Sequence, residues 1–235
     1  MAATIADKHP VDVLPPAAAI SRGRRGARIA WAGLAGFAAT FALVRARRSD
    51  AFDLAMTMRL QARAHPIMDR VLTAVSWPGF PPQSRLIPVT ITAGLLLTRL
   101  RLEAACFVVA WGTSLLATAL KSIMNRPRPI AGKDLRVAVA PLGGSSFPSG
   151  HVLTYVGIYG FVAYLLYALA PAVPGRRSAS ALLMGLVALV GPSRVQQGHH
   201  WFTDVLASYM IGTSYLIGVA SLYRRLKARR AGLRP

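Results

Sequence analysis

The amino-acid sequence predicts an all-α protein, an integral-membrane helical bundle of about six transmembrane helices. Hydrophobic residues make up 54% of its 235 positions, and they gather in six long apolar runs. Arginines cluster between and beside these runs, where they would flank membrane spans. The runs cover approximately residues 28–44, 86–98, 102–120, 152–170, 180–192 and 205–222.

Two of the runs, 86–98 and 180–192, are too short to span a membrane by themselves, because a span needs about 17–25 residues. They can span it only if flanking residues belong to the same helix. Arginine side chains at the flanks can extend them by reaching back to the interface. We expect residues 28–223 to form one membrane domain between a flexible basic tail, 1–27, and a second basic tail, 224–235. The first tail and run resemble a signal peptide, but we favour a retained span, because Arg residues follow the run and no small-residue cleavage site is convincing.

The segment between the first two runs, residues 51–79, has apolar residues near helical spacing, interrupted by Pro66. They are Phe52, Met56, Leu60, Ile67, Val71 and Val75. This pattern predicts one or two helices lying on the membrane surface. A loop packed on the bundle explains it equally well.

The net charge of +20 does not indicate a nucleic-acid partner, because no aromatic-basic interleaving or nucleic-acid motif accompanies it. The expected partner is the lipid bilayer. Cys106 is the only cysteine, so no intrachain disulfide can form. The sequence specifies no oligomeric state.

Short basic segments near residues 99–101, 176–177 and 224–234 would all lie on one side of a six-span protein. The positive-inside rule favours the cytoplasm for that side. The opposite loops also carry arginines, from Arg45 to Arg85, so the charge bias favours this orientation without deciding it. We expect a protein of the plasma (inner) membrane.

The third run ends in the basic stretch 121–129. Pro127 and Pro129 push the residue before each of them away from helical geometry. The helix should therefore end between Lys121 and Pro127, which leaves Lys121 on its last turn and Arg128 on an extended segment. A cationic helix end at a membrane boundary explains this stretch equally well.

The fourth run begins after Phe-Pro-Ser-Gly-His, residues 147–151. Pro148 suits the first turn of a helix, whose free N–H groups near Ser149 and Gly150 would favour an anion. Gly150 has no side chain, so an anion could approach the backbone. His151 would lie at the edge of this anion site.

The fifth run ends in the polar stretch 193–204, which contains Arg194. His200 and Asp204 share a helix face if the sixth helix begins near His200. Asp204 could then accept a hydrogen bond from one imidazole nitrogen and leave the other free as a nucleophile. A structural His–Asp pair is the competing interpretation. Asp204 enters an otherwise apolar helix, where an ionisable group indicates function.

The connections after the third and fifth runs open on the same side of the membrane. This brings three cations, a helix N-terminus and two histidines to one place, as phosphoryl transfer requires. The cations Lys121, Arg128 and Arg194 would repel a metal ion. Although His151, His199, His200 and Asp204 could be mistaken for ligands, no second carboxylate accompanies them. We expect no metal and no cofactor.

These stretches resemble the three-part signature of the type-2 phosphatidic acid phosphatase superfamily, written KxxxxxxRP, PSGH and SRxxxxxHxxxD. The resemblance covers residues 121–204 and implies an integral-membrane phosphatase. It implies that His200 is a nucleophile forming phosphohistidine, that Asp204 orients it, and that His151 protonates the leaving oxygen. The residues implied to hold the phosphate are Lys121, Arg128, Ser149, Gly150 and Arg194. His199 does not fit the spacing.

The sequence thus predicts a metal-independent membrane phosphatase that cleaves a lipid phosphate monoester or diphosphate. A lipid phosphotransferase could use the same site with a lipid acceptor in place of water. A non-catalytic anion-binding protein is disfavoured, because binding needs only the cations. Because the short basic segments favour the cytoplasm for the opposite side, we expect the site to face away from the cytoplasm, with phosphate at interface depth.

Overall fold

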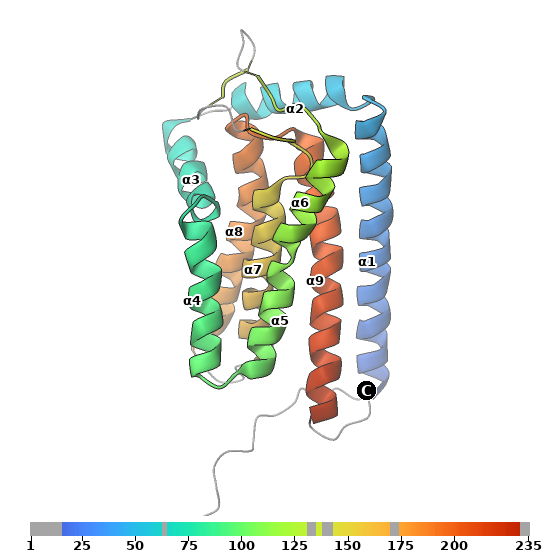
Figure 1. The fold of residues 1–235 in the computed structure, drawn as a ribbon, viewed down its shortest axis with the longest axis vertical. Helices are drawn as coiled ribbons and strands as arrows, with labels where there is room; N and C mark the ends of the chain where they lie inside the picture. The colour runs from blue at the N-terminus through green and yellow to red at the C-terminus, as the bar shows by residue number, and fades with distance from the viewer. Residues whose placement is uncertain (1–15, 63–64, 131–134, 138–142, 170–173, 231–235) are drawn as a thin grey trace, which may run out of the picture.

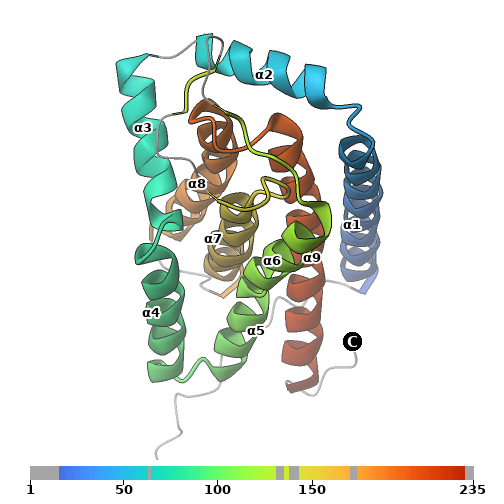
Figure 2. The ribbon, with the colours of Figure 1, turned by 45° about the horizontal axis from the view of Figure 1, so that its top comes forward.

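The protein is an all-helical bundle in a computed structural model that describes residues 16–62, 65–130, 135–137, 143–169 and 174–230. Figures 1 and 2 show long, roughly parallel helices around a central helix, with one helix lying across an end of the bundle. The elements are α1 (Pro16–Arg45), α2 (Asp50–Ala62), α3 (Pro66–Ser76), the 3-10 turn η1 (Trp77–Gly79), α4 (Gln83–Leu97), α5 (Arg101–Trp111), α6 (Thr113–Met124), α7 (Gly150–Leu169), α8 (Arg176–Gln196) and α9 (Phe202–Arg230).

Five segments of the described chain are long and apolar enough to cross a membrane, and the 15-residue helix α4 is a shorter apolar one. The second of the five segments, Arg101–Met124, joins α5 and α6 across Gly112. Each of the six apolar runs therefore lies in a helix or in this helix pair, as the sequence predicts.

The core lies around α7, which is the central helix in both views. Its side chains Leu153, Tyr155 and Phe161 are fully buried, as expected for a helix that is apolar on all sides. At Gly157 a Cβ would lie 2.3 Å from the Ala110 carbonyl oxygen. Glycine is needed there because the backbones of α5 and α7 approach so closely.

The tails are shorter than predicted. Helix α1 begins at Pro16 and α9 continues to Arg230, so much of the basic sequence assigned to tails 1–27 and 224–235 is helical. A proline tolerates the first helical position, and arginine and lysine are good helix formers that favour a C-terminal turn. The rest of these predicted tails lies outside the described residues.

The predicted surface segment 51–79 contains two helices with different placements. Helix α2 lies across the end of the bundle, whereas α3 runs along the bundle and continues through η1 towards α4 (Figures 1 and 2). Helix α3 is tied to its neighbours by buried contacts, because Ser193 donates to the Leu72 carbonyl at 2.7 Å and Tyr155 to the Val75 carbonyl at 2.7 Å. Only α2 therefore fits the prediction of a surface helix.

Helix α8 continues past Pro192, where the fifth apolar run was predicted to end. A proline in a helix lacks the N–H that would bond the carbonyl four residues earlier, which is that of Ala188. The Tyr209 hydroxyl of α9 directs its one proton towards the Val187 carbonyl at 2.7 Å and this carbonyl at 2.9 Å, and it accepts from the Gly191 N–H at 3.0 Å. A side chain of a neighbouring helix thus satisfies the freed backbone and lets α8 extend to the site.

Candidate active site

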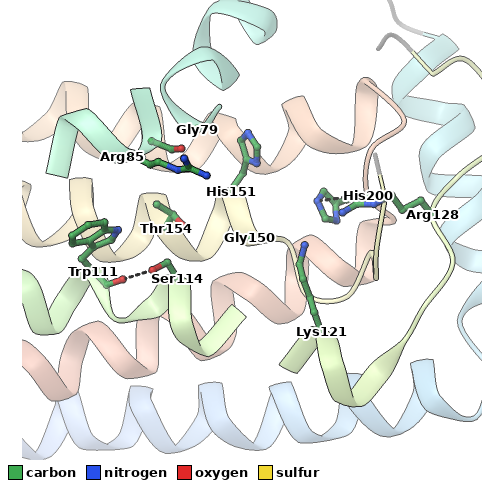
Figure 3. Close-up of a pocket in the computed structure, with 12 residues that line it drawn as sticks. Gly79, Arg85, Trp111, Ser114, Lys121, Arg128, Gly150, His151, Thr154 and His200 are labelled. Atoms are coloured by element: carbon green, nitrogen blue, oxygen red, sulfur yellow. Dashed lines mark hydrogen bonds between the residues drawn. The ribbon is translucent and has the colours of Figure 1, made fainter. Parts of the chain in front are cut away.

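A cavity of about 410 Å³ lies where α4, α6 and α7 meet the loops of one bundle end. Five residues of the sequence signature line it, and Figure 3 shows them around a common space: Lys121, Arg128, Gly150, His151 and His200. The topological prediction that these separate stretches meet at one end is therefore confirmed. Arg85, at the start of α4, adds a cation to the wall that the signature does not include.

The other three signature residues lie behind the pocket wall. The side chains of Ser149, Arg194 and Asp204 are all fully buried, at 0% exposure. The spacing of the motifs in the sequence does not distinguish such residues from those that line the pocket.

Helix α6 ends at Met124, and Asn125 closes it in the left-handed conformation, so Lys121 is on the last turn as predicted. A Cβ built on Gly150 would lie 3.9 Å from the Lys121 Nζ. Because that is an ordinary contact distance, Gly150 is not required sterically in this structure. The ammonium group and the start of α7 border the same space.

The sequence suggested that Pro148 lies in the first turn of this helix. Helix α7 begins at Gly150, however, so Pro148 lies before the helix. The Ser149 carbonyl accepts the first helical bond, from the Leu153 N–H at 3.1 Å. The Ser149 N–H already donates to the Ser208 hydroxyl at 2.8 Å. The amides at the open end of α7 are therefore those from Gly150 onward.

The imidazole of His200 is oriented by a backbone carbonyl. Its Nδ1 donates to the Ser146 carbonyl oxygen at 2.7 Å, which leaves Nε2 without a proton in the neutral ring. Burial, reinforced by Arg128 and Arg194, lowers the pKa of His200 well below its ordinary value. The ring is therefore neutral at pH 7, and its Nε2 lone pair faces the Arg128 guanidinium 3.3 Å away.

The predicted hydrogen bond between His200 and Asp204 is not formed. The Asp204 Oδ2 lies 3.6 Å from His200 Nδ1, which is beyond hydrogen-bond distance. Helix α9, the predicted sixth span, begins at Phe202 and not at His200. The Asp204 Oδ2 instead accepts the Trp201 N–H at 2.9 Å. Asp204 thus acts on His200 through its charge, and Ser146, which the sequence did not single out, fixes the tautomer.

Arg128 occupies the extended segment after α6, as the prolines predict. Its Nη1 donates to the His199 carbonyl at 2.7 Å and lies 3.3 Å from His200 Nε2. Burial lowers the pKa of Arg128, but the guanidinium stays charged because its ordinary pKa is so high. A fixed positive charge therefore faces the nitrogen that would attack.

Arg194 lies in the last turn of α8 and is held from three sides. Its Nη1 donates to the Gln197 side chain at 2.8 Å, its Nη2 contacts His199 Nδ1, and its guanidinium lies 5.0 Å from the centre of the Phe80 ring. His199, which received no role from the sequence, is therefore a neighbour that orients Arg194.

The position of His151 depends on a turn that the sequence did not connect with it. A Cβ on Gly79 would lie 2.2 Å from the His151 ring, so only glycine fits there. The ring of Phe80 lies 4.7 Å from the imidazole, edge to face, and Tyr155 lies on the other side at 6.4 Å. These contacts hold His151 against the cavity that it lines.

Buried polar atoms without a partner concentrate in this region. Among the described residues they are Arg128 Nε, Ser149 Oγ, His151 Nε2, Arg194 Nε and His199 Nε2. Such groups are normally hydrogen-bonded, and most of these can donate to an anion. An oxyanion of several oxygens, such as phosphate, would satisfy more than one of them at once.

The donor set does not suit a metal ion. Within the part of the chain that the structure describes, no group of three or more His, Cys, Asp or Glu side chains could hold one. The charged side chains that line the cavity with His151 and His200 are the cations Arg85, Lys121 and Arg128, and Asp204 is a single carboxylate near His200.

The chain matches the PAP2 superfamily over residues 101–228. It is 31% identical to phosphatidylglycerophosphatase B of Bacillus subtilis (strain 168) over 169 residues, which are 69% of this chain and 78% of the relative. The family match spans all three motifs, which lie within residues 121–204.

Two solved structures share the fold. The crystal structure of a transmembrane PAP2-type phosphatidylglycerolphosphate phosphatase from Bacillus subtilis aligns with a TM-score of 0.70 at 24% identity, covering 82% of this chain and 94% of that one. That of Aquifex aeolicus LpxE aligns with a TM-score of 0.56 at 22% identity, covering 72% and 94%. The family match and the 31% identity to the Bacillus subtilis relative show that this chain belongs to the PAP2 superfamily and is a phosphatase.

Proposed function

We propose that the protein hydrolyses a lipid phosphate through a phosphohistidine intermediate on His200, without a metal ion. The observation that supports this best is the arrangement at Nε2. This atom carries a lone pair, borders the cavity and lies 3.3 Å from a guanidinium nitrogen. A nucleophile beside a fixed cation is what attack on a phosphate needs.

In the first step Nε2 attacks phosphorus while the bond from phosphorus to the lipid oxygen breaks. A protonated His151 gives its proton to that oxygen. Lys121, Arg128 and Arg194 stabilise the negative charge as it shifts between oxygens. In the second step His151 takes a proton from water, the resulting oxygen attacks phosphorus, and the bond to His200 breaks to release phosphate.

The substrate that we propose is phosphatidylglycerol phosphate. The names of two of the similar proteins contain it. This lipid carries a phosphodiester besides the terminal phosphate monoester. Arg85, on the pocket wall outside the signature, offers a cation to that second anionic group, which phosphatidic acid lacks.

We expect purified protein in detergent to release phosphate from phosphatidylglycerol phosphate and from phosphatidic acid in the presence of EDTA. The kcat/KM should be higher for phosphatidylglycerol phosphate. Colorimetric phosphate release with and without added Mg²⁺ or Zn²⁺ measures this. Loss of activity on chelation, restored by either metal, would contradict the metal-free mechanism. A phosphotransferase would instead release phosphate only when a lipid acceptor is added.

Gly79→Ala is expected to lower kcat at least about tenfold, because a 1 Å misplacement of a catalytic group can cost about a hundredfold. The added methyl group cannot share space with the His151 ring. Gly94→Ala is the control, since nothing lies within 4 Å of its Cβ. Equal activity of the two variants would show that the turn does not position His151.

The active site is proposed to face away from the cytoplasm. The experiment introduces single cysteines by Gly143→Cys, beside the pocket, and Ser178→Cys, at the opposite end, in a Cys106→Ala background. Both sites are exposed. A membrane-impermeant thiol reagent on intact cells should label the first and spare the second. The reverse pattern would place the chemistry in the cytoplasm.

A further inference from the structure

Behind the pocket, Arg126 bridges two carboxylates that come from distant parts of the chain. Its Nη1 donates to Asp204 Oδ1 at 2.6 Å, and its Nη2 donates to Asp53 Oδ2 at 2.6 Å. Both aspartates are fully buried, and Arg126 is only 8% exposed. Such charge-assisted bonds in a buried site are strong and fix geometry. The catalytic loop is thereby connected to α2.

Asp53 also supports the start of α9 directly. Its Oδ1 accepts the Thr203 N–H at 2.8 Å, and its Oδ2 accepts the Thr203 hydroxyl at 2.8 Å. The first N–H groups of a helix have no partner within the helix. Asp53 therefore caps α9 from a different element, on the turn that carries Asp204.

Helix α2 is anchored at its other end as well. The Gln61 side chain donates to the Arg136 carbonyl at 2.7 Å and to the Gln196 carbonyl at 3.1 Å, and accepts the Arg136 N–H at 2.9 Å. Since α2 is bonded to the catalytic loops at both ends, it can hold Asp53 in a fixed place.

The charges show what Asp53 adds beyond a cap. Arg126 alone would neutralise Asp204 and weaken its effect on His200, whose Nδ1 lies 3.6 Å from Oδ2. With Asp53 present, the bridge carries two negative charges and one positive charge. The two carboxylates outweigh burial and raise the pKa of Arg126, so the guanidinium between them stays charged. A net negative charge therefore remains beside the imidazole that becomes cationic on attack.

We propose that Asp53 is a positioning residue of this phosphatase, acting through Arg126 to keep Asp204 fixed and negatively charged towards His200. The inference rests on the proposed function, because it concerns the charge that forms on His200 during phosphoryl transfer. Asp53 does not contact the pocket, so it should affect the rate of the chemical step and not substrate binding.

The test compares Asp53→Asn with wild type, using the lipid phosphate that wild type cleaves fastest. The amide keeps the shape but removes the charge, so kcat should fall about ten- to a hundredfold, the usual cost of losing an outer-shell partner. KM should stay within about threefold, because the binding cations are unchanged. An unchanged kcat in the folded variant would overturn the inference.

A double-mutant cycle separates this role from general support of the fold. In an Asp204→Asn background, Asp53→Asn should cost less than about threefold, since residues acting through one group are not additive. Full additivity of the two losses would overturn the inference. Arg126→Lys keeps one positive charge but cannot donate to both carboxylates at once, because lysine lacks the forked donors of arginine. This variant should therefore show the same loss of kcat. Wild-type activity of Arg126→Lys would contradict the inference that Asp53 acts through Arg126.

The matched control is Glu103→Gln. Glu103 is a buried carboxylate at the other end of the bundle, where it accepts from Tyr223 at 3.0 Å and from Lys227 at 3.2 Å. This variant should lower the unfolding temperature with kcat unchanged, and an equal kcat loss would overturn the inference. If Asp53→Asn does not fold, the inference is tested by the kcat of Arg126→Lys and by a double-mutant cycle that combines Arg126→Lys with Asp204→Asn. Turnover of the lipid phosphate by wild type tests the proposed function separately, because the kcat of each variant is compared with the kcat of wild type.

Discussion

Replacing His200 with Gln is expected to abolish turnover, with a loss of at least about a thousandfold, since removing a nucleophile removes the covalent route. Neither of the two other histidines described near the cavity is placed to take over. His199 contacts Arg194 through its Nδ1, and His151 is packed against Phe80 on the opposite wall. The measurement is phosphate release from the lipid, with thermal unfolding to show that the variant is folded.

A covalent label makes this prediction specific. Wild type quenched in alkali after brief exposure to a radiolabelled lipid phosphate should carry phosphoryl groups that acid removes, as phosphohistidine does, and His200→Gln should carry none. His65→Gln is the matched control, because His65 is an exposed histidine that only caps α3. Retention of the label in His200→Gln would show that the nucleophile is another residue.

Replacing His151 with Asn is expected to lower kcat for a lipid phosphate by about a hundred- to ten-thousandfold, the usual contribution of general acid–base catalysis. The loss should depend on the leaving group. A lipid alkoxide needs a proton to leave, whereas nitrophenolate does not, so the first step with p-nitrophenyl phosphate should be affected much less.

The same variant should trap the intermediate. Without His151 to activate water, p-nitrophenyl phosphate should give a burst of nitrophenolate equal to the enzyme concentration, followed by slow turnover. Stopped-flow absorbance measures both phases. An equal loss on both substrates with no burst would mean that His151 supports binding or packing and does not transfer the proton.

The sequence alone determined the helices and the signature. Six apolar runs predicted the spanning helices because lipid permits only segments that satisfy their own backbone. The prolines after Lys121 ended α6 where expected, since a proline restricts the residue before it. The connectivity then required Arg128, His151 and His200 to meet at one end of the bundle.

Only the tertiary structure decided how these side chains are held. The Ser146 carbonyl that bonds His200 lies 54 residues away in sequence, and Asp53 lies 73 residues from Arg126. Hydrophobic periodicity encodes which face of a helix is buried, but not which polar group of another segment that face meets. Contacts of this kind follow from the packing of the whole bundle, as does the Tyr209 hydroxyl that lets α8 continue past a proline.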